Sequence, residues 1–311
     1  MLLEKYKHVF GKDITSPCKF RPMQIKLIEN SVLPSNPRFW KNSPAQRAEV
    51  RKQLQSMLDM GIVRASTTAI VSNVLLVKRP GMPGKFRFTI DFRDLNDATA
   101  SVPWQMPETQ SQLDRLAGNL IFGCIDLSSY YHQIELDEGS KFLTGFITED
   151  GVFEYNRVAQ GLKGACAHAQ SQFQGALDSD PILKKYGLRN YFDDLPLAAK
   201  TEDEFIEQLE AVLRLGDTYN LKFNAEKSIF GVDSITHVGF IVNSRGFEVD
   251  PQRIESLKEI PTPKSMKGVQ SALGIWNYIR NFIPNFSTLA LPLTNLVGDK
   301  KKAKAFLWTA E

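Results

Sequence analysis

The spacing of apolar and polar residues predicts helices at both ends of the chain and a strand-rich centre. The first long helix is expected between Ser43 and Gly61. Its apolar residues recur three or four positions apart, at Val50, Leu54, Met57 and Leu58. Ser43 followed by Pro44 is typical of a helix start, and Gly61 is typical of a helix end. Proline-rich extended segments, including Pro22, Pro34 and Pro37, precede it.

Strand patterns dominate the centre of the chain. The β-rich runs NVLLVKRP (73–80) and KFRFTIDF (85–92), joined by GMPG, predict a two-stranded flap. Next come a strand at NLIFGCID (119–126), a hairpin over 142–158, a helix over 164–177 and a hairpin at NYFDDLPLAA (190–199). Antiparallel strands backed by helices predict an α+β fold.

Helical patterns return after residue 200. Thr201 and Glu204 predict a capping box, and the helix that follows has its apolar stripe at Phe205, Leu209, Val212 and Leu213. A hairpin is expected over 234–250, with its turn at 243–246. Asp250-Pro251 predicts a helix start, and Ser265 opens another helix that ends before Pro284.

Composition places the chain among ordinary globular proteins. It has 311 residues, of which 42% are hydrophobic and 23% charged, enough for a core of two or three subdomains. The three cysteines form no disulfide framework, so we expect reduced thiols, with Cys124 and Cys166 buried. No apolar run approaches the roughly 18 residues that span a bilayer, so no membrane association is expected. We expect a cytoplasmic protein.

Basic residues gather toward the C-terminus, although the net charge is only +3. Between Lys258 and Lys304 there are eight basic residues and two acidic ones. A run such as KKKAK (300–304) is usually solvated, but a whole basic segment beside an acidic centre suggests contact with a polyanion.

The acidic pair Asp193–Asp194 lies within an otherwise apolar run, and Asp126 ends the apolar run LIFGCID. Each motif alone would be a cap or turn. If the three carboxylates share one site, each pair repels by about 4 kcal/mol at roughly 4 Å, so a cation is needed between them. Mg²⁺ fits hard oxygen ligands, and two such ions can activate a hydroxyl and stabilise a leaving pyrophosphate. The spacing alone leaves open whether Asp126 meets the pair.

Six motifs in one order resemble those of reverse transcriptases. They are KFRFTIDFRDLN (85–96), IDLSSYYHQIEL (125–136), QGLKGACAHAQSQF (160–173), YFDD (191–194), LKFNAEKSIF (221–230) and THVGFIV (236–242). The phrase from Ile260 to Leu296 resembles the thumb region of gypsy-like long-terminal-repeat retrotransposons, relatives of the retroviral enzymes. The resemblance runs from about Pro22 to Glu311.

The resemblance implies a right-hand polymerase fold with fingers, palm and a small helical thumb. The implied parts are an N-terminal extension (1–21), fingers (22–118 and 139–158), palm (119–138 and 159–250, with a primer-grip hairpin), thumb (251–298) and the start of a tether (299–311) to a ribonuclease H domain missing from this sequence.

The same resemblance implies the catalytic and metal-binding residues. Asp126, Asp193 and Asp194 match the metal-binding carboxylates, and the neighbouring residue Leu127 is included with them. The implied cofactor is two Mg²⁺ ions, with Mn²⁺ as a substitute. Lys227 matches a lysine proposed to protonate the leaving pyrophosphate, although an isolated lysine is usually only exposed.

Nucleotide contacts are implied on three segments. Tyr131 matches the position whose ring crowds a ribose 2′-hydroxyl; its alternative is a buried tyrosine on a strand. Gln160 and Gly161 match the segment that touches the nucleotide sugar. The expected triphosphate and base contacts are Arg87, Lys78 and Lys85. Ala159 and Cys166 replace prolines common in the family.

Primer and template contacts are implied at ten positions. They are Tyr191, Phe192, Arg93, Asn96, His237, Val238, Gly239, Gln270, Gly274 and Tyr278. The last three share one helix face, which matches the thumb face in the minor groove; a helix-packing contact is the alternative. His237 is equally compatible with an ordinary hairpin residue.

The resemblance therefore implies an RNA- and DNA-templated DNA polymerase that adds deoxynucleotides (dNTPs) to a primer 3′-hydroxyl. Its expected partners are an RNA template, a primer–template duplex and dNTPs, within a homodimer or a larger polyprotein in cytoplasmic virus-like particles. The alternatives are a domesticated, catalytically silent fold that binds RNA or protein, and RNA-templated RNA synthesis, which Tyr131 disfavours.

Overall fold

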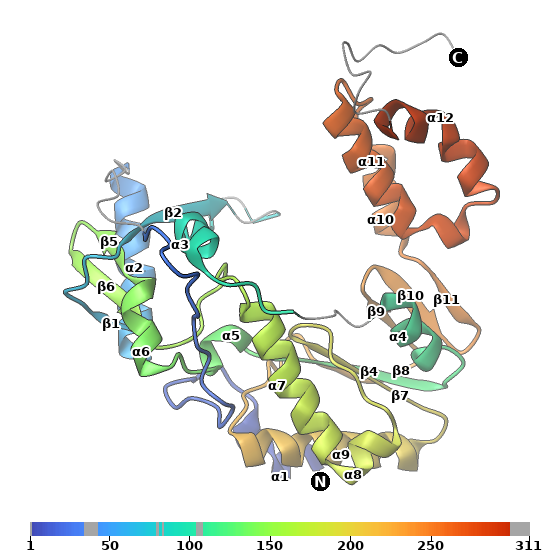
Figure 1. Cartoon of the computed structure of the whole chain (residues 1–311). Helices are drawn as coiled ribbons and strands as arrows, with labels where there is room; N and C mark the ends of the chain where they lie inside the picture. Colours follow the sequence, from blue (N-terminus) through green and yellow to red (C-terminus); the bar gives the residue numbers. More distant parts are fainter. Residues whose placement is uncertain (1, 34–42, 79–80, 83, 104–107, 299–311) are drawn as a thin grey trace. The chain divides into compact units, whose positions relative to one another are not determined.

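The computed structural model describes residues 2–33, 43–78, 81–82, 84–103 and 108–298, and they form the α+β fold expected from the sequence. Contacts divide the chain into two units (Figure 1): Met1–Glu108 with Ile121–Val232, and Thr109–Leu120 with Asp233–Glu311. The boundaries between fingers, palm and thumb drawn from the sequence stay a prediction. Pro34, Pro37, the 300–304 run and the tether at 299–311 lie outside the described residues.

A five-stranded sheet forms one part of the first unit, with strand order β1-β6-β5-β2-β3. Its strands are β1 (Val63–Ala65), β2 (Ser72–Lys78), β3 (Phe86–Ile90), β5 (Phe146–Thr148) and β6 (Gly151–Tyr155). The expected two-stranded flap is part of this larger sheet. β2 and β3 do pair, but β2 also pairs in parallel with β5, which joins the predicted hairpin at 142–158 to the same sheet.

Helix α2 (Pro44–Asp59) begins where the sequence predicts. The Ser43 side chain accepts a hydrogen bond from the Gln46 amide, and the Gln46 side chain accepts one from the Ser43 amide, so both ends of a capping box form. Three of the four predicted stripe residues are buried, at Val50, Leu54 and Met57. This buried stripe anchors α2 in the core of the first unit.

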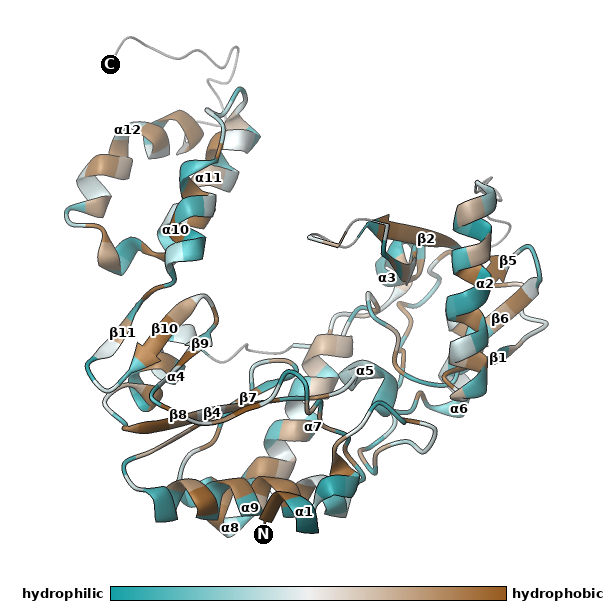
Figure 2. Ribbon diagram, turned by 180° about the vertical axis from the view of Figure 1, so that it is seen from behind, coloured by the Kyte–Doolittle hydropathy of each residue, from teal (hydrophilic) through white to brown (hydrophobic). Residues whose placement is uncertain are grey.

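A three-stranded antiparallel sheet, with order β7-β4-β8, forms the other part of the first unit. Its strands are β4 (Ile121–Asp126), β7 (Asp194–Ala199) and β8 (Ile229–Val232). Helix α9 (Glu202–Tyr219) packs on one face of it, as Figure 1 shows, and alternates hydrophobic and hydrophilic colours in Figure 2. The predicted hairpin at 190–199 supplies one strand only, because Tyr191 makes an isolated bridge to Asp194 instead of a second strand.

Gly123 is required at the centre of this sheet by the closeness of its neighbours. A Cβ there would lie 2.8 Å from the Ile229 carbonyl oxygen and 2.9 Å from the Phe205 ring. Both distances are shorter than van der Waals contact, so β8 and α9 approach β4 as closely as they do only because residue 123 lacks a side chain.

The remaining helices of the first unit are short, apart from α7. They are α1 (Leu2–Lys5), η1 (Lys7–Val9), α3 (Arg93–Ala98), α5 (Tyr130–Gln133), α6 (Glu138–Lys141), η2 (Phe142–Thr144), α7 (Ala165–Ser179) and α8 (Pro181–Lys185). The small residues of α7 pack it against the core: Ala165, Ala169 and Ala176 are all buried.

The second unit combines a small sheet with helices. Strands β9 (Ser234–His237), β10 (Phe240–Asn243) and β11 (Gly246–Val249) form two consecutive hairpins, where the sequence predicts one. The helices are α4 (Thr109–Leu116), α10 (Pro251–Lys258), α11 (Met266–Tyr278), η3 (Arg280–Phe282) and α12 (Phe286–Gly298). Asp250 and Ser265 cap α10 and α11 as predicted. The sequence did not predict α12, which contains Pro292.

The cysteines are all free thiols, but the expectation that Cys124 and Cys166 are both buried is wrong for Cys166. That thiol is exposed, Cys124 is half-buried, and Cys18 is the buried one. Cys166 lies in the first turn of α7, whose buried face carries Ala165 and Ala169 instead. Within the described residues, no helix has the length and apolar character needed to cross a membrane.

Candidate active site

Asp126 and Asp194 face each other across neighbouring strands. Asp126 is the last residue of β4 and Asp194 the first of β7, and the antiparallel register pairs them directly. The amide of Leu127 donates to the Asp193 carbonyl at 2.9 Å, which extends this pairing to the next residue. Side chains in such a pair have Cβ atoms about 5 Å apart. The structure therefore brings together two carboxylates that are distant in sequence.

A tight turn presents the acidic pair. Tyr191 and Asp194 exchange two backbone hydrogen bonds, of 2.8 and 3.1 Å, around Phe192 and Asp193. Phe192 has φ of 54°, the left-handed region that costs a residue with a side chain about 1–2 kcal/mol. Its ring packs edge-on against Tyr191 at 4.8 Å between centroids. Asp193, at the end of the turn, is exposed.

Burial and nearby charge disfavour the ionised form of two side chains here, Asp194 and Cys124. Burial, followed by the nearby Asp193 and Asp126, raises the pKa of Asp194 to about 6. The same surroundings raise the pKa of the Cys124 thiol to about 12, with burial as the main cause. The partly buried Asp194 thus ionises less readily than an isolated carboxylate, and a bound cation would favour its charged form.

The ammonium group of Lys227 supplies a cation from the chain itself. Its Nζ donates to Asp126 Oδ2 at 2.9 Å, and this hydrogen bond is the main cause of the raised pKa of Lys227. Asp126 is only 7% exposed, and among the described residues its buried Oδ1 has no hydrogen-bond partner. Lys227 therefore lies at the acidic site, as its predicted role requires, instead of on a remote surface.

The segment around Lys227 is tied to the backbone of Asp126. The backbone N–H of Asn224 donates to the Asp126 carbonyl at 2.8 Å, and the Ser228 hydroxyl accepts from the backbone N–H of Asp126 at 3.2 Å. Ser228 also donates to the Asn224 carbonyl at 2.7 Å. Sequence reasoning missed Asn224 and Ser228; the motif NAEKS contains both, but only the fold shows that they hold Asp126.

One oxygen of this site suits a hard divalent cation, but the described residues do not form a complete metal site. An orphaned, buried carboxylate oxygen on Asp126, opposite Asp194, is the type of ligand that Mg²⁺ prefers. Among the residues that the structure describes, however, no three acidic, histidine or cysteine side chains are gathered closely enough to enclose a metal ion. The metal-ligand roles of Asp126, Asp193, Asp194 and Leu127 stay predictions.

Tyr131 lies on α5, not on a strand as its alternative interpretation supposed. Its hydroxyl and the Cys166 Sγ are hydrogen-bonded at 3.2 Å, and partial burial raises the pKa of the phenol. The thiol of Cys166 thus contacts the group expected to select the nucleotide sugar. Ala159, the other position that departs from the family pattern, is buried.

The Gln160–Gly161 segment is exposed, and a side chain of α3 forms hydrogen bonds to its backbone. Gly161 has φ of 92°, and the Asn96 side chain donates to its carbonyl at 2.8 Å while accepting from the Lys163 amide at 2.7 Å. The ammonium of Lys163 in turn donates to the Thr99 carbonyl at 2.6 Å. The side-chain amide of Asn96 therefore positions this turn, and the template contact expected of Asn96 stays a prediction.

The expected flap residues are all on the surface of the five-stranded sheet. Arg87 lies on β3 opposite Val77, while Lys78 ends β2 and Lys85 precedes β3; all three side chains are exposed. Arg93 at the start of α3 makes a two-pronged ion pair with Asp91, at 2.7 and 2.6 Å. Its guanidinium is thus oriented by a carboxylate from the adjoining strand end.

In the second unit, the predicted primer-grip residues form the turn between β9 and β10. Val238 and Gly239 have φ of 45° and 80°. His237 is 1% exposed and bonded to Gln112 Oε1 of α4 at 3.0 Å, so its side chain belongs to the interior of this unit. Tyr278 donates to the Val238 carbonyl at 2.6 Å, which ties α11 to the same turn.

The other two residues of the predicted thumb face, Gln270 and Gly274, are exposed on α11. A Cβ at Gly274 would have no atom within 4 Å, so the fold itself does not require a glycine there. The packing interpretation holds for Tyr278, whose ring lies under the Arg253 guanidinium and stacks on Phe240. It does not account for Gly274.

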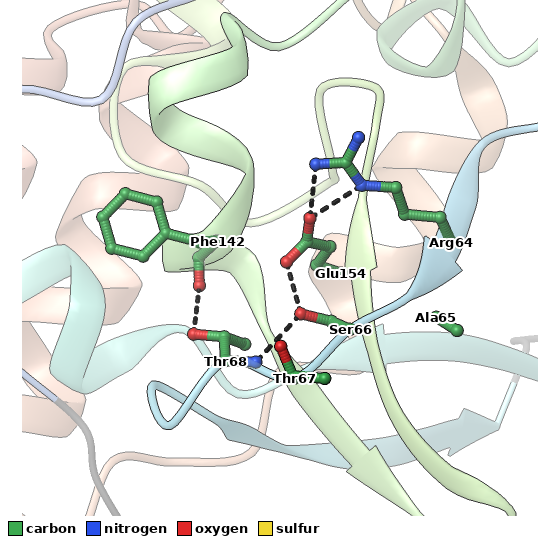
Figure 3. Close-up of a pocket in the computed structure, with 7 residues that line it drawn as sticks. All are labelled: Arg64, Ala65, Ser66, Thr67, Thr68, Phe142 and Glu154. Carbon is green, nitrogen blue, oxygen red and sulfur yellow. Dashed lines mark hydrogen bonds and ion pairs between the residues drawn. The ribbon is translucent and has the colours of Figure 1, made fainter.

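A separate polar pocket of about 500 Å³ lies in the five-stranded sheet, as Figure 3 shows. Glu154 accepts from Arg64 at 2.7 Å and from the Ser66 hydroxyl, and Thr68 donates its hydroxyl to the Phe142 carbonyl at 3.0 Å. These groups bind one another, and the candidate active-site residues are not part of the pocket lining.

Comparisons with known proteins show the family of the chain. Residues 77–242 match the family model described as reverse transcriptase (RNA-dependent DNA polymerase). The chain is 29% identical over 301 residues to the retrovirus-related Pol polyprotein from transposon opus of Drosophila melanogaster, covering 95% of this chain and 29% of that protein. It is 32% identical over 255 residues to the corresponding polyprotein from transposon gypsy of the same species, covering 80% and 24%.

A solved structure of a foamy viral protease–reverse transcriptase in complex with double-stranded DNA superposes with a TM-score of 0.84 at 23% identity. The match covers 99% of this chain and 53% of that one. This likeness confirms the fold class, the right-hand polymerase architecture. The chain belongs to the reverse transcriptase family, and it spans about a quarter of the length of the retrotransposon polyproteins that it matches.

Proposed function

We propose that this chain is the polymerase part of a reverse transcriptase that copies RNA and DNA templates into DNA. The observation that carries the proposal is the direct pairing of Asp126 with Asp194 across β4 and β7, with the buried Asp126 Oδ1 left over. A family fold that keeps such a site has the means for nucleotidyl transfer. The proposed partners are a template, a primer duplex and a dNTP.

Asp126, Asp193 and Asp194, with the backbone of Leu127, would hold two Mg²⁺ or Mn²⁺ ions. Bound divalent ions in such a site supply charge stabilisation for the attacking and leaving oxygens of an in-line displacement. Burial and the neighbouring carboxylates raise the pKa of Asp194, so a bound cation would stabilise its charged form. Lys227, within reach of this pair, would give a proton to the leaving pyrophosphate.

The nucleotide contacts follow from the exposed groups. Arg87, Lys78 and Lys85 offer cationic side chains for the triphosphate. Tyr131, with its hydroxyl held by Cys166, would exclude a ribose 2′-hydroxyl, and Gln160 and Gly161 would contact the sugar. Val238, Gly239, Gln270 and Gly274 would contact the duplex.

Extension of a DNA primer on a homopolymer RNA template tests the proposal. We expect extension with dNTPs and Mg²⁺, none after chelation by EDTA, and none with ribonucleotides alone. Asp193→Asn should abolish extension, whereas Asp217→Asn, on the exposed surface of α9, should not. Extension by Asp193→Asn at the wild-type rate would refute the assignment of this carboxylate.

A second candidate is a catalytically silent fold that only binds RNA or a protein partner. It is favoured by one observation, the ion pair between Lys227 and Asp126, which ties up one of the carboxylates. A gel-shift measurement beside the extension assay separates the two. Binding without extension favours the silent fold.

A homodimer or polyprotein assembly and a cytoplasmic, particle-associated location complete the proposal of a reverse transcriptase.

A further inference from the structure

Two buried amide side chains lie directly behind the acidic turn. Gln170, on α7, is 1% exposed, and Asn190, just before the turn, is 0% exposed. Gln170 Nε2 donates to the Asn190 backbone carbonyl at 2.6 Å and to Asn190 Oδ1 at 3.0 Å. Gln170 Oε1 accepts from Asn190 Nδ2 at 3.1 Å and from the Phe192 amide at 3.0 Å. Neither residue was singled out from the sequence.

These contacts use the full hydrogen-bonding capacity of the Gln170 side chain. A primary amide has two N–H donors and two acceptor lone pairs, and all four are engaged here. The second donor of Asn190 Nδ2 reaches the Phe192 carbonyl at 3.1 Å. A glutamate at residue 170 would lack both donors and would place a buried charge against two oxygens, and a methionine would supply none of the four bonds.

The turn held by these bonds is strained. Phe192 has φ of 54°, and both its N–H and its C=O are held by the amide pair Gln170–Asn190. Left-handed backbone at a residue with a side chain persists only when surrounding contacts impose it. The next two residues are Asp193 and Asp194. The direction of their carboxylates thus depends on a conformation that the amide pair maintains.

We propose that Gln170 and Asn190 are positioning residues that hold the Phe192 turn so that Asp193 and Asp194 are presented toward Asp126. The inference rests on the proposed function of these carboxylates. Neither amide touches a substrate; both act through the backbone of Phe192. Loss of the pair lets the turn relax to an ordinary conformation, and displacement of a catalytic group by about 1 Å costs on the order of 100-fold in rate.

Gln174 provides a matched control on the same helix. It lies one turn after Gln170 and donates to the Leu188 carbonyl at 3.2 Å and to Asp178 at 3.0 Å. Gln174 therefore bonds the chain segment that leads into the turn but not the turn itself. A role limited to packing α7 against this segment would make Gln170→Met and Gln174→Met equivalent.

The first measurement is hydrogen–deuterium exchange of the peptide that spans residues 188–196, which does not depend on activity. Loss of the bond from the Phe192 amide should speed its exchange about tenfold in Gln170→Met and leave it unchanged in Gln174→Met. Equal exchange in the two variants, or no change in Gln170→Met, overturns the inference.

The second measurement is primer extension with the same variants at saturating primer–template. Gln170→Met should lower kcat on the order of 100-fold and raise the Mg²⁺ concentration for half-maximal rate, with the dissociation constant for duplex unchanged. Adding Asn190→Ala to Gln170→Met should cost little more, because the two residues act as one unit. Equal kcat losses in Gln170→Met and Gln174→Met refute the inference alone; an inactive wild type refutes the proposed function and the inference with it.

Discussion

Gly274 offers a substitution whose effects on stability and on binding should have opposite signs. It lies inside α11, and an added Cβ would meet no atom within 4 Å. Alanine is favoured over glycine in a helix interior by about 1 kcal/mol, and nothing in the structure opposes that gain. Gly274→Ala should therefore raise the free energy of unfolding by roughly 0.5–1 kcal/mol.

Gly175 gives a matched comparison in the first unit. It lies within α7 and also has open space around its Cβ position, so Gly175→Ala should produce the same gain. Urea unfolding of both variants measures the two gains side by side. A loss of stability in Gly274→Ala, beside the expected gain in Gly175→Ala, would contradict the open space around residue 274.

The two alanine variants should separate in a binding assay. If Gly274 is kept for close approach of a duplex, Gly274→Ala should weaken primer–template binding several-fold, and Gly175→Ala should leave it unchanged. Fluorescence anisotropy with a labelled duplex at fixed salt concentration measures both. Equal affinities for the two variants would refute the reasoning that the glycine serves a nucleic-acid contact.

Three further predictions follow from burial and exposure. Gly123→Ala forces contacts of 2.8 and 2.9 Å and should destabilise the protein by about 1–2 kcal/mol, read by urea unfolding; a gain in stability would contradict the packing of β4. Burial lowers the pKa of His237 to about 4, so the unfolded state binds more protons between that value and about 6.5, and stability should fall by up to about 1.4 kcal/mol for each pH unit of acidification in that window. His237→Gln should remove this part of the slope, and an unchanged slope would show that His237 is accessible when folded. Maleimide should modify the exposed Cys166 before the buried Cys18, as peptide mass spectrometry can show, and dNTP should slow that reaction; prior labelling of Cys18 would contradict the assigned exposures.

Local features of the sequence predicted the helix starts and the position of the acidic turn. Ser43, Thr201, Asp250 and Ser265 cap helices where expected, because capping depends on residues within one turn of each other. The capping box expected at Thr201 forms only by half, because the Glu204 side chain accepts from the Lys200 amide instead of the Thr201 amide. The strand that ends at Asp126 was also located, because its run of apolar residues is continuous.

Long-range pairings could not be predicted in the same way. The parallel contact of β2 with β5 joins segments far apart in the chain, and periodicity carries no information about the partner of a strand. The pairing of Asp126 with Asp194 was expected from resemblance alone, since spacing left it open. Gln170 was overlooked because a glutamine inside a helical pattern normally indicates a solvent-facing position, whereas here the turn supplies all its partners.

If the proposed function is right, Asp194, paired with Asp126, is required for nucleotide addition by this chain. Single-turnover incorporation of one dNTP on an RNA template, compared between wild type, Asp194→Asn and the surface control Asp217→Asn, tests it most directly. We expect Asp194→Asn to lose incorporation about 100- to 1,000-fold, the scale of one lost electrostatic contact to the reacting group, while incorporation by Asp217→Asn and duplex binding by all three proteins stay within about twofold. Incorporation by Asp194→Asn at the rate of the control would contradict it.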